Sequence, residues 1–199
     1  RYVPFPITGE SEGRLIAGKI LAKWAPRVII SIEVCGRTGR GQYLNMRGED
    51  IRRVTPRMDL LFLLQQRPRP FSVGIGDGGN EVGFGLVSKE LLGSHGIQPC
   101  AVATDQLIVG SVSNWAVYAL LLFLSIETGK NFLPETASEN ALLEHLVGNG
   151  AVDGFSGHGI PRIDGRSART SREFFAQLLH VYRSFSADPV PLVVAKSRL

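Results

Sequence analysis

A glycine-rich segment with two acidic side chains directly follows a short apolar run in the sequence. Residues 71–85 read FSVGIGDGGNEVGFG, so that Asp77 lies among the glycines and Glu81 just beyond them. Glycine lets the backbone approach a ligand closely, at an entropic cost that a simple connector would avoid. We therefore expect a ligand-binding loop whose carboxylates suit a cation, either a divalent metal ion or the ammonium group of an amino acid.

The same segment matches the fingerprint of dinucleotide-binding loops, because Gly74, Gly76 and Gly79 have its G-x-G-x-x-G spacing. In that fingerprint, backbone amides and a helix N-terminus hold a pyrophosphate, which Asp77 and Glu81 would repel. We therefore favour an acid-lined small-molecule site over a nucleotide site. The alternative is a structural turn whose acids cap the next helix.

Three predicted strands each precede an acid. The pairs of strand and acid are 28–32 with Glu33, 71–75 with Asp77, and 100–103 with Asp105. Parallel strands have their carboxyl ends at one edge of a sheet, where open α/β folds bind ligands. We therefore expect the three acids to converge in a crevice there, with Glu81 beside them in the first turn of a helix and Asp153 as a fourth candidate.

Carboxylates gathered in this way need a cation or a proton, because each raises the pKa values of the others. Oxygen ligands suit Mg²⁺ or Mn²⁺, whereas a protonated carboxyl group beside an ionised one suits general acid–base catalysis. The residues that we expect to act as catalytic groups or as metal ligands are Glu33, Asp77, Glu81 and Asp105. Sequence alone leaves both chemistries open, together with simple ion pairs between these acids and Arg37, Arg47 or Arg52.

Other polar residues are candidates for substrate binding. Arg37 and Arg47 flank a polar loop, and their planar guanidinium groups suit a carboxylate or a phosphate. Asn80, Ser113 and Asn114 lie at predicted helix starts, where helix capping would also explain them. Both interpretations of these three residues stay open.

Composition narrows the class of protein. The 199 residues are 44% hydrophobic, and 22 Lys and Arg against 18 Asp and Glu give a net charge of +4. The basic residues are scattered, which argues against a nucleic-acid partner. The longest apolar run, 115–124, is about half of the roughly 20 residues that a membrane span needs, so we expect a core helix and no membrane partner.

The compartment and partners are expected to be those of a small-molecule enzyme. Cys35 and Cys100 form no C-x-x-C motif, which fits a reducing compartment. We therefore expect a cytoplasmic protein, or a mitochondrial matrix protein in a eukaryote. Its substrate would be an amino acid or a small carboxylate, and homo-oligomerisation stays open.

Hydrophobic spacing predicts the helices and strands that carry these residues. Short apolar strands alternate with segments of helical period, which indicates an α/β fold with a mainly parallel sheet. The predicted helices are 12–24, 59–66, 81–92, 113–125, 139–147 and 172–183. We expect one domain over residues 1–199, with helices on both faces of the sheet in three Rossmann-like layers. A tail at 186–199 is either an edge strand or disordered.

Five blocks of the sequence together resemble one protein family. The blocks are EVCGR at 33–37, YLNMRGED at 43–50, GIGDGGNEVGFG at 74–85, Thr104-Asp105 with Ser113-Asn114-Trp115, and GAVDG at 150–154. Their order and spacing over about residues 33–165 are similar to those of the D-glutamate cyclase-like C-terminal domain, formerly a domain of unknown function. The resemblance implies a lyase that cyclises D-glutamate to 5-oxo-D-proline with loss of water. It also implies that a first strand–helix unit of the domain is missing from this sequence.

The implied reaction suggests roles for the candidate residues, and these roles rest on the placement of the residues at the strand ends. Cyclisation needs a neutral amine and a leaving oxygen that is protonated or metal-bound, and therefore both a base and an acid. The roles implied are base for Asp77 or Glu81, proton donor or metal ligand for Glu33 or Asp105, α-carboxylate binding for Arg37 or Arg47, and oxyanion binding for the amides of Gly78 and Gly79.

Two functions of other classes stay open beside the cyclase. The same acids could hold Mg²⁺ or Mn²⁺ in a metal-dependent hydrolase or phosphatase, with a metal-bound water as nucleophile. Alternatively, the chain could bind a small ligand without catalysis. No cofactor other than a divalent metal ion is indicated by the sequence.

Overall fold

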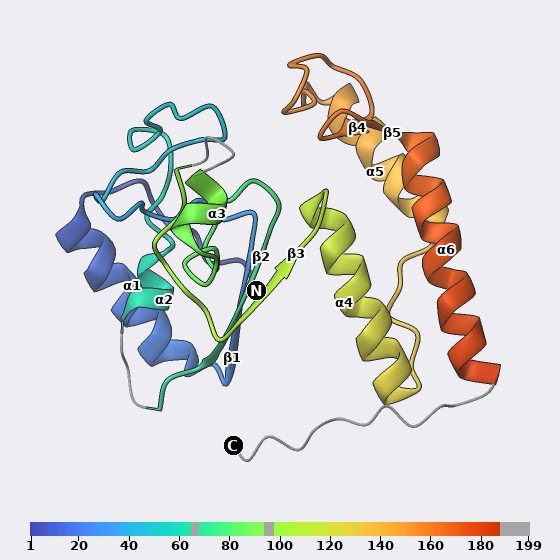
Figure 1. Cartoon of the computed structure of the whole chain (residues 1–199), viewed down its shortest axis with the longest axis horizontal. Coiled ribbons are helices and arrows are strands. Elements are labelled where there is room, and N and C mark those ends of the chain that lie inside the picture. The colour runs from blue at the N-terminus through green and yellow to red at the C-terminus, as the bar shows by residue number, and fades with distance from the viewer. Residues whose placement is uncertain (65–67, 94–97, 188–199) are drawn as a thin grey trace. The chain divides into compact units, whose positions relative to one another are not determined.

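The computed structural model describes residues 1–64, 68–93 and 98–187 of the chain (Figure 1). Two compact units, Arg1–Ala116 and Val117–Leu199, make up the chain. The expectation of a single domain over residues 1–199 stays a prediction. Most of the predicted tail, from residue 188 onward, lies outside the described residues.

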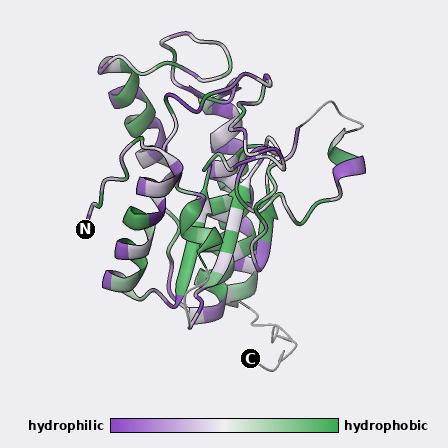
Figure 2. Ribbon diagram, turned by 90° about the vertical axis from the view of Figure 1, so that its left-hand side faces the viewer, coloured by the Kyte–Doolittle hydropathy of each residue, from purple (hydrophilic) through white to green (hydrophobic). Residues whose placement is uncertain are grey.

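The first unit contains a parallel sheet of three strands. These are β1 (Val28–Ile32), β2 (Phe71–Gly76) and β3 (Gln106–Val109), hydrogen-bonded in the order β1-β2-β3. Val28 pairs with Phe71, and Val73 pairs with Gln106. The strands carry mostly hydrophobic residues (Figure 2), as expected for a parallel sheet flanked by helices. The predicted α/β fold class is confirmed.

Helices α1 (Glu10–Trp24) and α2 (Leu60–Leu63) pack against each other in the first unit. Ala17 and Leu21 of α1 and Leu60 of α2 are buried. Helix α1 ends at Ala25, which has the left-handed φ of 39° and donates its N–H to the Leu21 carbonyl. This capping arrangement stops the helix directly before β1.

Two predicted elements are wrong, and both errors concern the segment that follows β2. Residues 100–103 form isolated bridges instead of a strand, because the Cys100 and Ala101 amides bond to the Gly79 and Arg37 carbonyls in loops. Residues 81–87 form turns and bridges instead of a helix, and only α3 (Lys89–Gly93) is helical there. The turn is fixed by Gly83, which has a φ of 113° that a side chain would strain.

The second unit is helical. It contains most of α4 (Ser113–Thr128), together with α5 (Thr136–Gly148) and α6 (Ala168–Ala187), and an antiparallel pair, β4 (Arg162–Ile163) and β5 (Arg166–Ser167). Leu122, Leu133 and Leu178 form its core. The three predicted helices in this part of the sequence are confirmed. None of the helices in the described part of the chain combines the length and the apolar character needed to cross a bilayer.

The absence of a side chain at Gly74 allows the segment after β2 to fold back onto this strand. A Cβ atom at Gly74 would collide with the Val82 carbonyl oxygen and would lie 2.8 Å from the Gly83 Cα. Both neighbours are backbone atoms, so they cannot rotate away. The fold therefore depends on glycine at this position.

We predict opposite effects for two glycine-to-alanine substitutions. Gly74→Ala should lower the free energy of unfolding by about 1–3 kcal/mol, because it overpacks a rigid contact. Gly18→Ala in α1, where a Cβ atom would have no neighbour within 4 Å, should raise it by up to about 1 kcal/mol through helix propensity. Urea unfolding of both variants measures these changes. A Gly74→Ala protein as stable as wild type would contradict the tight contact.

Candidate functional site

Three carboxylates meet at the carboxyl ends of β1 and β2. Glu33 follows β1, Asp77 follows β2, and Glu81 comes from the turn beyond Asp77. One carboxylate oxygen from each of the three lies within 4.8 Å of the other two. The structure thus brings together three of the four acids that the sequence singled out, and their chemical roles stay predictions.

Glu81 is the most enclosed of the three acids, with 4% of its surface exposed. Its Oε1 accepts the Gly78 N–H at 3.0 Å and its Oε2 accepts the Gly79 N–H at 2.8 Å. Burial raises the pKa of the Glu81 carboxyl group, the charge of Asp77 adds to this, and the backbone amides oppose it. Glu81 therefore holds a proton more readily than an ordinary glutamate.

Two expectations about this turn need correction. Glu81 is not in a helix but pairs with Cys35 in an antiparallel bridge, which places its backbone beside the segment that follows β1. The amides of Gly78 and Gly79 were expected to bind an oxyanion, yet both donate to the Glu81 carboxylate. Their role in the structure is to hold this side chain in place.

Asp77 binds the start of α4. Its Oδ2 accepts the backbone N–H of Ser113 at 3.0 Å, in the first turn of a 16-residue helix. A carboxylate is favoured there by the helix dipole and by the unpaired amides of the first turn. The Ser113 hydroxyl is buried and has no hydrogen-bond partner within the described ranges. Asn114 is exposed, so Ser113 contributes to the site through its backbone.

Glu33 occupies an unusual backbone conformation at the end of β1. Its φ is 56°, in the left-handed region that non-glycine residues rarely adopt. Its N–H donates to the Ile75 carbonyl at 3.1 Å, which holds the strained residue against β2. Glu33 forms the exposed side of the acid cluster.

Asp105 lies at the amino-terminal ends of the strands, opposite the ends that carry the acid cluster, contrary to expectation. The third strand begins after Asp105 instead of ending before it, and the pairing of Val73 with Gln106 places Asp105 beside Ser72. Its Oδ2 accepts the Ser72 N–H at 2.7 Å and an Arg69 N–H at 2.9 Å. The Arg69 guanidinium holds the pKa of Asp105 well below its usual range. Asp105 is therefore removed from the group of catalytic candidates.

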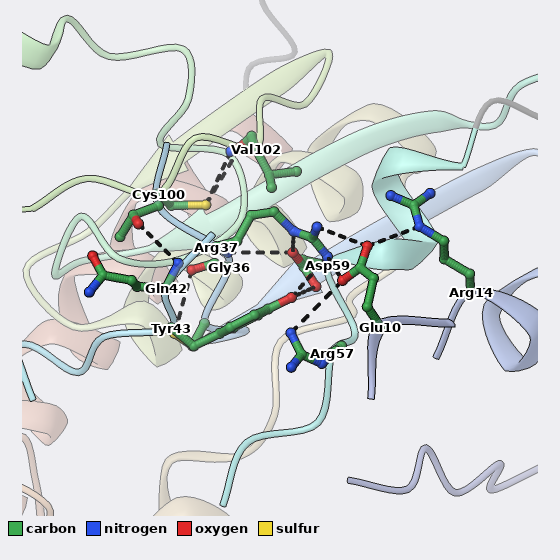
Figure 3. Close-up of polar contacts among 12 residues, drawn as sticks. Glu10, Arg14, Gly36, Arg37, Gln42, Tyr43, Arg57, Asp59, Cys100 and Val102 are labelled. Carbon is green, nitrogen blue, oxygen red and sulfur yellow. Dashed lines mark hydrogen bonds and ion pairs between the residues drawn. The ribbon is translucent and has the colours of Figure 1, made fainter. Parts of the chain in front are cut away.

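Arg37 is the centre of a network of charged and polar side chains, drawn in Figure 3. Its Nε donates to Asp59 at 2.7 Å, and its terminal nitrogens donate to Glu10 at 3.0 Å and to the Tyr43 hydroxyl at 3.0 Å. Tyr43 in turn donates to the fully buried Asp59 at 2.7 Å. Protein acceptors thus already engage its guanidinium group, and the expected role of Arg37 in substrate binding stays a prediction.

Arg47 has different surroundings from Arg37. It lines a polar pocket of about 360 Å³ together with Gly78, Asn80 and Gln98. The structure thus brings three of the predicted substrate-binding residues to one place, next to the turn that holds Glu81. Gln98 was not anticipated, because a lone polar residue in a loop carries no motif.

The remaining candidates have structural surroundings. Both cysteines are free, and burial raises the pKa of Cys35 to about 11 and that of Cys100 to about 12, which disfavours a reactive thiolate. Asp153 lies in the second unit, where its carboxylate accepts the backbone N–H groups of Ser156 at 2.9 Å and Gly165 at 3.0 Å. Asp153 therefore holds its own loop together.

Fold and site define an α/β protein with an acid-lined site at the carboxyl edge of a parallel sheet. The chain belongs to the D-glutamate cyclase-like, C-terminal family, whose model matches residues 7–179. It is also similar to human mitochondrial D-glutamate cyclase, with 39% identity over 103 residues. That match covers 49% of this chain and 17% of the human protein, so the chain corresponds to a small part of that relative.

Replacing Glu81 by glutamine should change the pH dependence of stability. Since the folded pKa of Glu81 is raised above its ordinary value of 4.5, its contribution to stability is complete below that pH and decreases as pH rises through the folded pKa. Glutamine does not titrate and leaves one glycine N–H facing an NH₂ group. Glu81→Gln should therefore be less stable than wild type, by a margin that shrinks as pH rises.

Urea unfolding at a series of pH values between about 4 and 8 measures this difference in the free energy of unfolding. The slope of that free energy against pH reports the difference in bound protons between the unfolded and folded states. Glu12→Gln, at an exposed position of α1, is the matched control and should show no such trend. A margin between wild type and Glu81→Gln that stays constant or grows with pH would contradict a raised pKa.

Proposed function

We propose that this chain is a D-glutamate cyclase-like lyase that converts D-glutamate to 5-oxo-D-proline and water. The observation that carries the proposal is the cluster of Glu33, Asp77 and Glu81, whose carboxylate oxygens lie within 4.8 Å of one another. Membership of the D-glutamate cyclase-like family supports it, as does the similarity to the human mitochondrial enzyme.

The reaction sets a clear demand on the site. The α-nitrogen forms a bond to the γ-carboxyl carbon, and one C–O bond of that carboxyl group breaks. An ammonium nitrogen loses two protons to become the ring amide, and the leaving oxygen gains two protons to depart as water. The site must therefore accept protons from nitrogen and deliver protons to oxygen within one small volume.

The three acids are suited to divide this work. Asp77, which accepts the Ser113 amide at the start of α4, acts as the base toward the ammonium group. Glu81, whose pKa is raised by burial, carries the proton for the leaving oxygen. Glu33, on the exposed side of the cluster, attracts the ammonium group as the substrate enters.

The same cluster favours one other candidate function. Three carboxylate oxygens this close together could bind a single Mg²⁺ or Mn²⁺ ion, for which oxygen ligands are preferred. Glu33, Asp77 and Glu81 would then hold the metal ion of a hydrolase or phosphatase, and the ion would activate a water molecule. The two candidates differ in metal dependence and in substrate.

Turnover of D-glutamate by the metal-stripped protein should distinguish the cyclase from the metal-dependent hydrolase. We expect formation of 5-oxo-D-proline to persist in EDTA, and Asp77→Asn to reduce it by roughly 100-fold or more through loss of the base. Chromatographic detection of 5-oxo-D-proline is the measurement. Asp105→Asn makes the same chemical change at the amino-terminal ends of the strands, away from the acid cluster. It is therefore the matched control and should retain activity.

Other outcomes would contradict the cyclase proposal. Hydrolysis of a phosphoester that appears only with Mn²⁺, without turnover of D-glutamate, would favour the metal-dependent hydrolase. A third outcome is that wild type binds D-glutamate but forms no product, and that Asp77→Asn weakens this binding. That outcome would indicate a ligand-binding domain without catalysis.

A further inference from the structure

We infer that another pocket of the first unit binds the phosphate group of a small phosphorylated molecule. The pocket has a volume of about 420 Å³, and Arg40 and Lys89 line it. None of the three clustered acids lines this pocket, so it is separate from the acid cluster. The inference goes beyond the proposed lyase reaction, because neither D-glutamate nor 5-oxo-D-proline carries a phosphate group.

The pocket has two cationic side chains and no acidic one among the lining residues that the structure describes. Arg40 comes from the loop after β1, and Lys89 is the first residue of α3. Within the described ranges of the chain, neither side chain makes a hydrogen bond or an ion pair, whereas Arg37, Arg52 and Arg69 all bind carboxylates. Two cations that lack an acidic partner attract an anion that both can share.

A phosphate monoester suits this pair of cations better than a carboxylate does. Its second pKa is about 6, so that it carries nearly two negative charges at neutral pH, and its three terminal oxygens can accept from both side chains at once. Arginine offers a planar fork of donors, and lysine adds three donors on a flexible stem. A carboxylate, in contrast, has one charge to share between two cations.

The rest of the lining suits the organic part of such a molecule. Pro99 and Ala101 contribute apolar surface, and Gln98 contributes a side-chain amide. The volume of about 420 Å³ lies within the range of small-molecule sites and exceeds what a phosphate group alone fills. The pocket therefore has room for a carbon skeleton beside the phosphate group.

Hydrogen bonds hold the turn that carries Arg40 against the opposite wall of the pocket. The Thr38 Oγ accepts the backbone N–H groups of Arg40 at 3.3 Å and of Gln42 at 3.2 Å, which fixes the turn. The Ala101 N–H donates to the Arg37 carbonyl at 2.8 Å, which joins the two walls. A site formed in advance loses little backbone entropy when a ligand binds.

The wall formed by residues 99–101 is also anchored on its far side. Pro99 and Ala101 line the pocket, whereas Cys100 between them packs with Val82 in the hydrophobic core. The Cys100 N–H donates to the Gly79 carbonyl at 2.9 Å. The wall is thus attached both to the core and to the glycine-rich segment.

An NMR titration of the backbone amides with inorganic phosphate and with phenyl phosphate tests the inference. EDTA is present, so that the acid cluster holds no metal ion that could bind phosphate. We expect saturable shifts of the Gly39 and Ala101 amides, and tighter binding of phenyl phosphate because its ring can pack on Pro99. Arg40→Gln and Lys89→Gln should each weaken binding of both probes by roughly 10-fold, through loss of a charged hydrogen-bond donor.

Matched controls separate this site from attraction by the net charge. Arg53→Gln and Lys19→Gln remove the same charges at exposed positions outside the pocket lining, and they should leave both affinities within about twofold of wild type.

Four results would overturn the inference. They are shifts that do not saturate, unchanged binding by both pocket variants, an equal loss in the controls, and inorganic phosphate that binds as tightly as phenyl phosphate. The third result would indicate attraction by net charge alone, and the fourth would indicate a site for the free ion instead of a phosphorylated molecule.

Discussion

The return of the chain over β2 after residue 76 is the constraint on which the candidate site depends. Gly74 leaves room for the Val82–Gly83 backbone, and the Gly83 N–H donates to the Val102 carbonyl at 2.8 Å. The return brings Glu81 back beside Asp77, although Glu81 follows it in a turn and not in a helix. Without glycine at these positions, Glu81 could not join the carboxylates of Glu33 and Asp77.

The network around Arg37 connects α1, the loop after β1 and the segment before α2. Arg37 links Glu10 of α1, Asp59 before α2 and Tyr43 of the connecting loop, as Figure 3 shows. A fully buried carboxylate such as Asp59 is costly unless it is paired, and removal of one partner of a buried pair destabilises by about 3–5 kcal/mol.

Local patterns in the sequence predicted the elements with continuous apolar runs, and with them the positions of Glu33 and Asp77. They failed where long-range contacts decide the structure. Arg37 has partners 22 and 27 residues away in sequence, so no spacing could show that its guanidinium group is engaged. Asp105 was misplaced because the apolar run before it pairs with loops, and the strand begins after it.

We expect the Glu81 carboxyl group to keep its proton to a higher pH than an ordinary glutamate, because it is buried and lies beside the charge of Asp77. A carbon-13 NMR titration of the Glu81 carboxyl group, assigned with Glu81→Gln, tests it most directly. We predict a titration midpoint above the ordinary value of 4.5, and a shift of that midpoint to lower pH in Asp77→Asn, because the charge of Asp77 contributes to the raised pKa. A midpoint at or below 4.5 that Asp77→Asn leaves unchanged would show that neither burial nor Asp77 raises the pKa of Glu81.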